Sequence, residues 1–142
     1  MRVIGGAGEC SGSIYLLGGT YVPSTQVVVR FEDFGFMPHV AINTAVICVS
    51  GVFAEGFFTG TIDEAMATKA MIDMSQRTIV VADRSKFDIL AFARVAELRR
   101  VHYLVTDAMP DHALRIALDD AEVEIVICNP NEASRVPADK LS

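Results

Sequence analysis

Short apolar runs alternate along this chain with segments in which apolar residues recur at helical spacing. Five runs are rich in β-branched or aliphatic residues and are typical of strands. Continuous apolar runs of this length are expected for parallel strands buried on both faces of a sheet. Their alternation with helices predicts an α/β fold with right-handed crossovers. The predicted strands are Ile14–Leu17, Ala45–Val49, Thr78–Ala82, Tyr103–Val105 and Val123–Cys128.

The clearest helix signal covers Ile62–Gln76. Thr61 and Glu64 have the T-x-x-E spacing of a capping box, which satisfies free N–H groups at the start of a helix. Apolar residues recur on one face at about 3.6 residues per turn, and we expect this face to pack on the sheet rather than to bind a cofactor. The apolar stripe consists of Met66, Ala67, Ala70, Met71 and Met74.

Weaker patterns complete the predicted secondary structure. A second helix is predicted over Asp111–Leu118, opened by Pro110, and Ile89–Leu98 also has helical propensity. Val27–Arg30 could form a short strand or begin a helix. The polar segment Asn129–Ser142 contains two prolines and is expected to close the domain or to fray.

Length and composition favour one globular domain in a reducing compartment. The chain has 142 residues, of which 51% are hydrophobic, enough for a sizeable core. It has no apolar run long enough to span a membrane, and its N-terminus lacks the apolar region of a signal peptide. Cys10, Cys48 and Cys128 are spaced for neither a disulfide framework nor a zinc site, so we expect buried thiols and a cytoplasmic location.

The charge balance argues against nucleic acid as a direct partner. The formal net charge is −6, whereas DNA-binding surfaces neutralise phosphates with Lys and Arg. The basic pair Arg99–Arg100 is interpreted as a solvated helix or loop end. We therefore expect neither DNA nor a membrane to bind this chain directly.

Small, hydroxyl and charged residues follow the predicted strands. Because ligands of open parallel sheets bind at the carboxyl ends of the strands, these residues are candidate ligand contacts. Among them, Asp83, Ser85 and Lys86 form the most specific group, since a carboxylate, a hydroxyl and an ammonium can together hydrogen-bond a polyol and neutralise an anion. Alternatively, Asp83 is simply the N-cap of a helix and Lys86 lies in solvent. The sequence leaves both interpretations open.

No motif for a metal, a nucleotide or covalent chemistry is recognisable. The Gly-rich segment Gly5–Gly12 misses the last position of a dinucleotide fingerprint and contains no Walker sequence, so an N-terminal arm is the simpler interpretation. His39, His102 and His112 have no metal-ligand spacing. We therefore expect no cofactor, no metal ion and no catalytic residue.

Short motifs at the predicted strand ends and on the predicted helix follow one another in a set order. They are Leu16–Thr20, Ser50–Val52, Glu55–Thr59, Lys69–Ile72, Val80–Phe87 and Leu104–Asp107. Each is weak alone, but their order and spacing resemble the C-terminal sensor domain of DeoR-type bacterial repressors, the class that includes glycerol-3-phosphate and sugar-catabolism repressors. The resemblance extends over about Ile14 to Cys128.

The resemblance implies a fold and a function. The fold would be a three-layer α/β sandwich with a mostly parallel sheet, similar to ribose-5-phosphate isomerase and glucosamine-6-phosphate deaminase. The ligand would be a phosphorylated sugar or a related anionic metabolite. Its binding would alter an oligomer, a dimer or tetramer, and release DNA that an N-terminal winged helix-turn-helix holds.

The sequence departs from the family pattern near its start. No helix-turn-helix is recognisable, so the family's contact with DNA would need a segment that this sequence does not contain. The strand and the Gly/Thr-rich phosphate loop that open the family's sensor are missing or replaced by residues 1–13, and Cys48 stands at a usual glycine position. We therefore predict a flexible or truncated arm over residues 1–13 and an effector-sensing domain over residues 14–142.

Two other functions compete with effector sensing. One is a sugar-phosphate isomerase-like enzyme, which would need a carboxylate base. Similar isomerases carry acidic residues where this chain has Ser50–Phe53, so a binding module is favoured over an enzyme. The other is a remnant that only oligomerises. The effector contacts that strand-end position and the resemblance indicate are Gly18, Gly19, Ser50, Gly51, Lys69, Asp83, Ser85 and Lys86.

Overall fold

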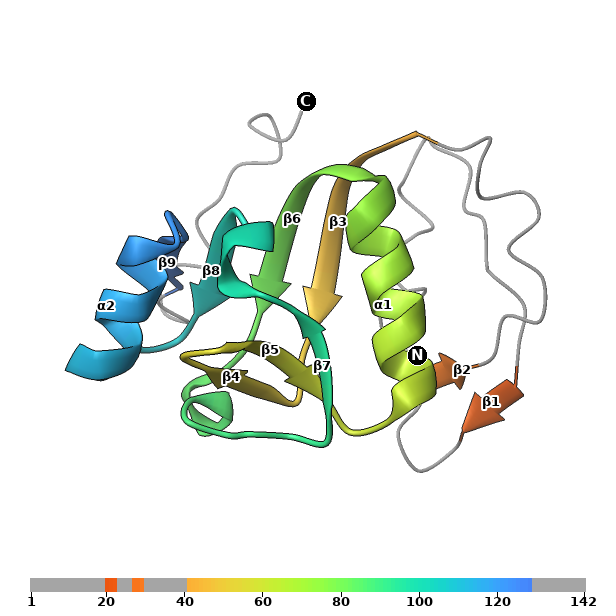
Figure 1. The fold of residues 1–142 in the computed structure, drawn as a ribbon, viewed down its shortest axis with the longest axis horizontal. Helices are drawn as coiled ribbons and strands as arrows, with labels where there is room; N and C mark the ends of the chain where they lie inside the picture. Colours follow the sequence, from red (N-terminus) through yellow and green to blue (C-terminus); the bar gives the residue numbers. More distant parts are fainter. Residues whose placement is uncertain (1–19, 23–26, 30–40, 129–142) are drawn as a thin grey trace. The chain divides into compact units, whose positions relative to one another are not determined.

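The computed structural model describes residues 20–22, 27–29 and 41–128, which belong to two compact units, residues 1–39 and 40–142. In the first unit, β1 (Thr20–Val22) pairs antiparallel with β2 (Val27–Val29) (Figure 1). Of the two interpretations of Val27–Arg30, the strand is therefore confirmed. The predicted strand Ile14–Leu17, the tail Asn129–Ser142 and the predicted boundary at residue 13 lie outside the described residues.

The second unit is an α/β fold with a parallel sheet, as predicted. β3, β6, β8 and β9 form this four-stranded sheet in that order, and β4, β5 and β7 form a small antiparallel sheet (Figure 1). Four predicted strands and both main predicted helices are confirmed to within a few residues. The elements are β3 (Ile42–Cys48), β4 (Gly51–Phe53), β5 (Gly56–Thr59), α1 (Ile62–Met74), β6 (Ser75–Val81), the 3₁₀ turn η3 (Arg84–Lys86), β7 (Ala93–Ala96), the 3₁₀ turn η4 (Leu98–Arg100), β8 (Tyr103–Thr106), α2 (His112–Asp120) and β9 (Glu124–Ile127).

Side-chain caps fix the starts of both helices. The Thr61 hydroxyl accepts a hydrogen bond from the backbone N–H of Glu64 at 3.2 Å, as half of the predicted capping box. At α2, the Asp111 carboxylate accepts from the backbone N–H of Leu114 at 2.9 Å. Within the described residues, neither α1 nor α2 has the length and apolarity that a membrane-spanning helix needs.

The connections of the parallel sheet all advance across it in the same direction. α1 links β3 to β6, a segment containing β7 links β6 to β8, and α2 links β8 to β9, so that spatial order follows chain order. Because such crossovers are right-handed, connections that advance one way all lie on the same face. The buried core lies between this face and the connections. It includes Ile47, Val80 and Leu104 from the sheet, Ile72 from α1, and Leu114 and Leu118 from α2.

The opposite face of the parallel sheet is exposed in the described part of the chain, so these residues do not bear out the prediction of strands buried on both faces. By register, Val46, Val81 and Val126 point to this face, and they are 64%, 39% and 36% exposed. Cys48 shares the face, and both Cys48 and Cys128 are exposed rather than buried as predicted. No connection in the described residues covers this face, and the third layer of the predicted sandwich stays a prediction.

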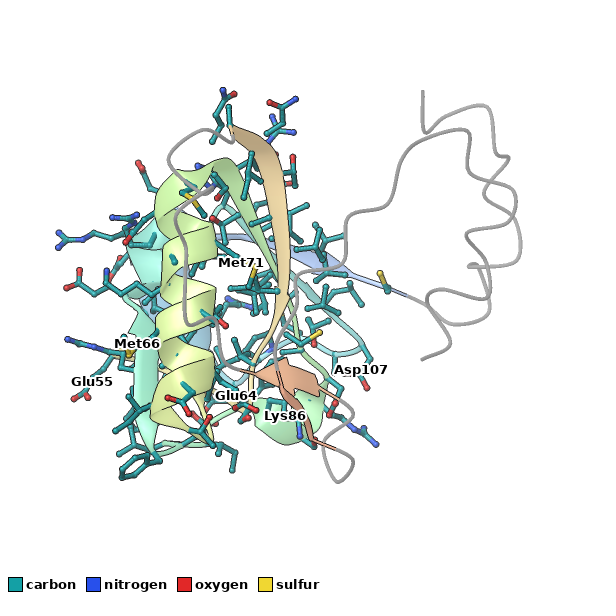
Figure 2. All side chains as sticks on the ribbon, turned by 90° about the vertical axis from the view of Figure 1, so that its right-hand side faces the viewer. Glu55, Glu64, Met66, Met71, Lys86 and Asp107 are labelled. Carbon is teal, nitrogen blue, oxygen red and sulfur yellow. The ribbon has the colours of Figure 1, made fainter. Side chains whose placement is uncertain are left out.

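The buried side of α1 differs from the predicted methionine stripe. Ala65, Thr68 and Ile72 are buried, whereas Met66 is 64% exposed and Met71 lies at the edge of the core (Figure 2). The small side chains of Ala65 and Thr68 let the helix backbone approach the sheets closely, which favours this face over the bulkier methionines.

The small antiparallel sheet was not predicted. β5 pairs with β4 and with β7, and the pairing with β7 aligns Phe57 with Ala96 and Thr59 with Ala93. The predicted helix over Ile89–Leu98 is therefore wrong, because long-range pairing with the buried strand β5 overrides the local helical propensity of this alanine-rich segment.

Candidate functional site

The candidate site lies at the carboxyl ends of three adjacent parallel strands. Cys48 of β3 pairs with Val81 of β6, which pairs with Val105 of β8. Ser50, Asp83 and Asp107 each come two residues after these partners, so they stand at the same level of neighbouring strands. We call this row of polar residues, together with the turn η3, the strand-end site. Figure 2 shows Lys86 and Asp107 at the same end of the sheet.

The turn after β6 is held by two carboxylates. Asp83 Oδ1 accepts from the backbone N–H of Ser85 at 2.8 Å, which makes Asp83 the N-cap of η3. Asp107 Oδ1 accepts from the backbone N–H of Arg84 at 2.7 Å and thereby ties the end of β8 to the turn. The N-cap interpretation of Asp83 is therefore confirmed.

The same hydrogen bonds favour the ionised form of the Asp83 carboxyl. Bonds from the Ser85 side chain and then from the Ser85 backbone, followed by the positive charge of Lys86, hold the pKa of the exposed Asp83 carboxyl below its usual value. At neutral pH the site therefore presents a carboxylate that accepts hydrogen bonds and an ammonium that donates them. This pair suits a ligand with both hydroxyl groups and negative charge.

Gly51 has a packing role at this site. A Cβ atom on Gly51 would lie 2.2 Å from the carbonyl oxygen of Ile89, so the segment that follows η3 fills the space beside this residue. A bridge between Val52 and Phe87 and a 2.9 Å hydrogen bond from Asp88 N to Val52 O hold the same segment against β4. Packing within the protein thus accounts for the glycine without a ligand.

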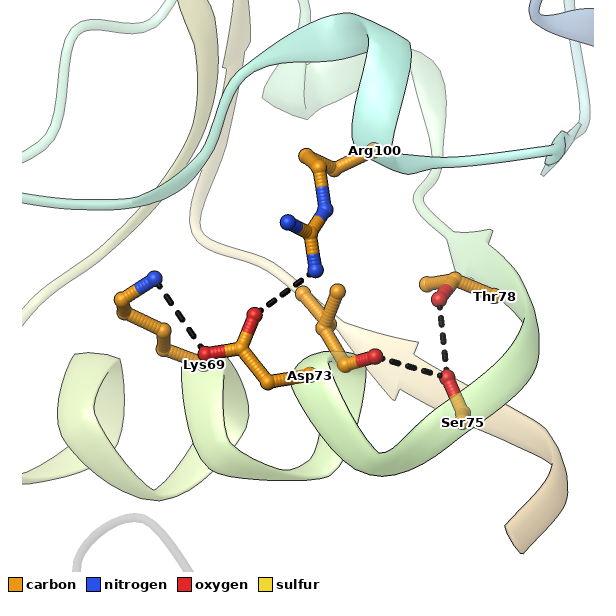
Figure 3. A network of polar contacts seen from close by, with 6 residues as sticks. Lys69, Asp73, Ser75, Thr78 and Arg100 are labelled. Carbon is orange, nitrogen blue, oxygen red and sulfur yellow. Dashed lines mark hydrogen bonds and ion pairs between the residues drawn. The ribbon is translucent and has the colours of Figure 1, made fainter.

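Lys69 lies apart from the other predicted contacts. It is on α1, where its Nζ is 3.3 Å from Asp73 Oδ2, and Arg100 of η4 binds the other oxygen of the same carboxylate at 2.7 Å (Figure 3). The structure thus brings together Ser50, Asp83, Ser85 and Lys86 but not Lys69. Gly18 and Gly19 lie outside the described residues.

Asp107 joins the strand-end site although the sequence had not assigned it a role. The sequence did contain a clue, because Asp107 follows β8 just as Asp83 follows β6. Its contact with Arg84, however, depends on the pairing of the two strands. In the described ranges, no group of three or more His, Cys, Asp or Glu side chains is arranged to hold a metal ion.

Comparison with known proteins relates this chain to bacterial regulators. The family model described as the DeoR C terminal sensor domain matches residues 7–108. The HTH-type transcriptional repressor GlcR of Bacillus subtilis is 28% identical over 119 residues, covering 84% of this chain and 46% of GlcR. The glycerol-3-phosphate regulon repressor of Haemophilus influenzae is 30% identical over 103 residues, covering 72% of this chain and 40% of the repressor. The chain spans less than half the length of these relatives.

Proposed function

Because the chain belongs to the DeoR C-terminal sensor domain family, we propose that it is the effector-sensing part of a transcriptional repressor. The effector is a phosphorylated sugar or a related anionic metabolite, and its binding changes the state of a DNA-binding part outside this chain. The relatives are named as repressors, and a net charge of −6 favours sensing over direct contact with DNA.

The row of Ser50, Asp83 and Asp107 is the observation that carries this proposal. Open parallel sheets bind ligands at the carboxyl ends of their strands, and these three residues stand there on adjacent strands. The residues fall within the range that the sensor family matches. In the proposed complex, Lys86 neutralises the anionic group of the effector, and the Asp83 carboxylate accepts a hydrogen bond from a ligand hydroxyl.

The same geometry favours binding over catalysis. An isomerase of this kind needs a carboxylate positioned to take a proton from a substrate carbon. The carboxylates of Asp83 and Asp107 instead accept hydrogen bonds from the backbone of η3, and the segment Ser50–Phe53 contains no acidic residue. A carboxylate with a lowered pKa, as at Asp83, is also a weaker base.

Self-association and a cytoplasmic location belong to the same proposal. Exposed apolar side chains on the open sheet face, such as Val46 and Val126, are typical of surfaces that seek partners. We expect a dimer or a tetramer in light scattering, and a chain that stays monomeric at high concentration would contradict this part of the proposal.

Calorimetric titration with a panel of sugar phosphates and the matching neutral sugars tests the ligand class. We compare the unchanged chain with Lys86→Gln and with Arg77→Gln, a matched control that removes the same charge near the start of β6, where Arg77 stacks on Tyr103. Lys86→Gln should weaken binding by about 1.5–3 kcal/mol, roughly tenfold to hundredfold in Kd, whereas Arg77→Gln should leave it unchanged. Equal losses in both variants would remove Lys86 from the site, and tight binding of a neutral sugar would exclude an anionic effector.

A further inference from the structure

A cavity of about 430 Å³ lies between α1, β7 and η4, away from the strand-end site. Its position follows from the chain path, because the end of α1 leads directly into the start of β6 and η4 leads into the start of β8. The cavity therefore lies toward the amino ends of the parallel strands, whereas Ser50, Asp83 and Asp107 follow their carboxyl ends. We call it the arginine pocket, and its charged lining residues are Lys69, Asp73, Arg94, Glu97, Arg99 and Arg100.

The arginine pocket concentrates positive charge in an acidic chain. Four of its lining side chains are cationic and two are carboxylates, although the whole chain carries a net charge of −6. Positive side chains that lie close together repel one another, and this repulsion costs free energy unless an anion offsets it. An anion from solution would offset this repulsion.

The ion pairs within the pocket leave part of this charge uncompensated. Asp73 binds both Lys69 and Arg100, at 3.3 and 2.7 Å, so one negative charge serves two cations (Figure 3). Glu97 pairs with Arg99 at 2.6 Å. Arg94 on β7 lines the same cavity and has no ion pair with another described residue within 4.0 Å.

The size and lining of the cavity indicate a small metabolite rather than a simple ion. Its volume falls in the range of about 300–1,000 Å³ that is typical of small-molecule sites. Ile72 and Val95, both buried, and Ala96 add apolar side chains to its lining, which can pack against a carbon skeleton. Arginine guanidinium groups bind phosphoryl oxygens in a bidentate manner, and a phosphate monoester carries close to two negative charges near pH 7. The excess of two cations matches such a dianion.

We propose that the arginine pocket is a second anion site, which binds the phosphoryl group of a small metabolite independently of the strand-end site. Arg94 is the principal contact, because Asp73 already holds Lys69 and Arg100 and Glu97 already holds Arg99. Arg99 is the second contact, for which the phosphoryl group competes with Glu97. The bridge through Asp73 then has a supporting role, since it fixes η4 against the end of α1 and so keeps the pocket open.

The test is a titration of the full chain with inorganic phosphate, followed residue by residue through backbone amide NMR shifts. Sodium chloride at equal ionic strength is the control for screening. We expect saturable shifts in residues 94–100. Arg94→Gln should weaken the apparent Kd at these residues about tenfold without changing the melting temperature, because Arg94 has no described ion pair to lose. Arg94→Lys should retain part of the affinity, and Arg99→Gln provides a second loss variant.

A third variant, Lys86→Gln, separates this inference from the proposed function. It should leave the shifts of residues 94–100 unchanged, because Lys86 lies at the strand-end site. Shifts confined to residues 83–86, shifts that chloride reproduces, or shifts that survive both Arg94→Gln and Arg99→Gln would each overturn the second site and leave the strand-end proposal intact. Conversely, loss of sugar phosphate binding at Lys86 alone would not affect the arginine pocket.

Discussion

The two faces of the parallel sheet carry similar apolar side chains but have different surroundings. On one face, Val80 and Leu104 are fully buried beneath the connections, while on the other Val46 is 64% exposed. The difference follows from topology, because three right-handed crossovers that advance in one direction place every connection on a single face. An apolar strand therefore does not by itself show that both of its faces are covered.

The largest expected effect is a loss of folding stability that differs between substitutions on the two faces of the sheet. Leu104→Ala should lower the free energy of unfolding by about 2–5 kcal/mol, since it leaves a cavity beneath the connections. Val46→Ala is the matched control on the open face and should cost less than about 1 kcal/mol, because its side chain is largely in water already. Urea unfolding at low protein concentration measures both.

The control also shows how the comparison could fail. If Val46→Ala is as costly as Leu104→Ala at every protein concentration, the chain itself covers the open face in solution, and the contrast between the faces is wrong. If its cost grows with protein concentration, copies of the chain associate through this face.

The next effect concerns the edge where the two sheets meet. Gly51→Ala should destabilise the fold by about 1–3 kcal/mol, because the new Cβ would lie 2.2 Å from the Ile89 carbonyl oxygen. Gly60→Ala is the matched control, since the nearest atom to its Cβ would be Glu64 Oε2 at 4.0 Å. Thermal unfolding compares the two. Equal stability of both variants would show that the segment after η3 does not pack on β4 in solution, and would reopen a ligand role for Gly51.

Local patterns predicted the parts of the fold that local interactions determine. The capping pair Thr61 and Glu64 marked the start of α1, and the apolar runs around Val80 and Leu104 marked central strands. The pairing of β5 with β7 was missed because it joins Phe57 to Ala96 across a long stretch of chain, and short segments give no local sign of such a partner. The hairpin of β4 and β5 is local, but its strands are only three and four residues long. As with the pairing of β5 and β7, the methionine stripe on α1 could not show which side the sheets would cover.

The strand-end site was predictable in position but not in detail. Ser50, Asp83 and Lys86 follow predicted strands, so their common edge could be inferred from the sequence. The role of Asp107 and the separation of Lys69 from this edge depend on strand order and helix placement, which the sequence pattern leaves open. The arginine pocket combines residues of α1, β7 and η4. It could not be predicted from the sequence, because β7 lies in the segment Ile89–Leu98 that was predicted as a helix.

The smallest expected effect is the pH dependence of the η3 turn, which separates the local role of Asp83 from the packing of the sheet. Its carboxyl pKa is lowered in the folded chain, chiefly by hydrogen bonds from Ser85 and further by the charge of Lys86. A lowered pKa means that the unfolded chain binds a proton more readily. Asp83 therefore contributes stability that is fully present above the unfolded pKa and is lost as pH falls through the folded pKa.

NMR titration of the Asp83 carboxyl carbon and the Ser85 amide measures this effect. Both should titrate with one midpoint, below that of Asp83 in an isolated peptide spanning residues 81–87, because the peptide lacks the ordered turn. In Asp83→Asn the Ser85 amide should lose this transition, while the fold remains intact because the side chain is exposed and the core lies elsewhere. A midpoint equal to or above that of the peptide would mean that the Ser85 bonds do not persist in solution. The Asp83 carboxylate would then not be held in place for a ligand hydroxyl, and the strand-end site would rest on Ser50, Lys86 and Asp107.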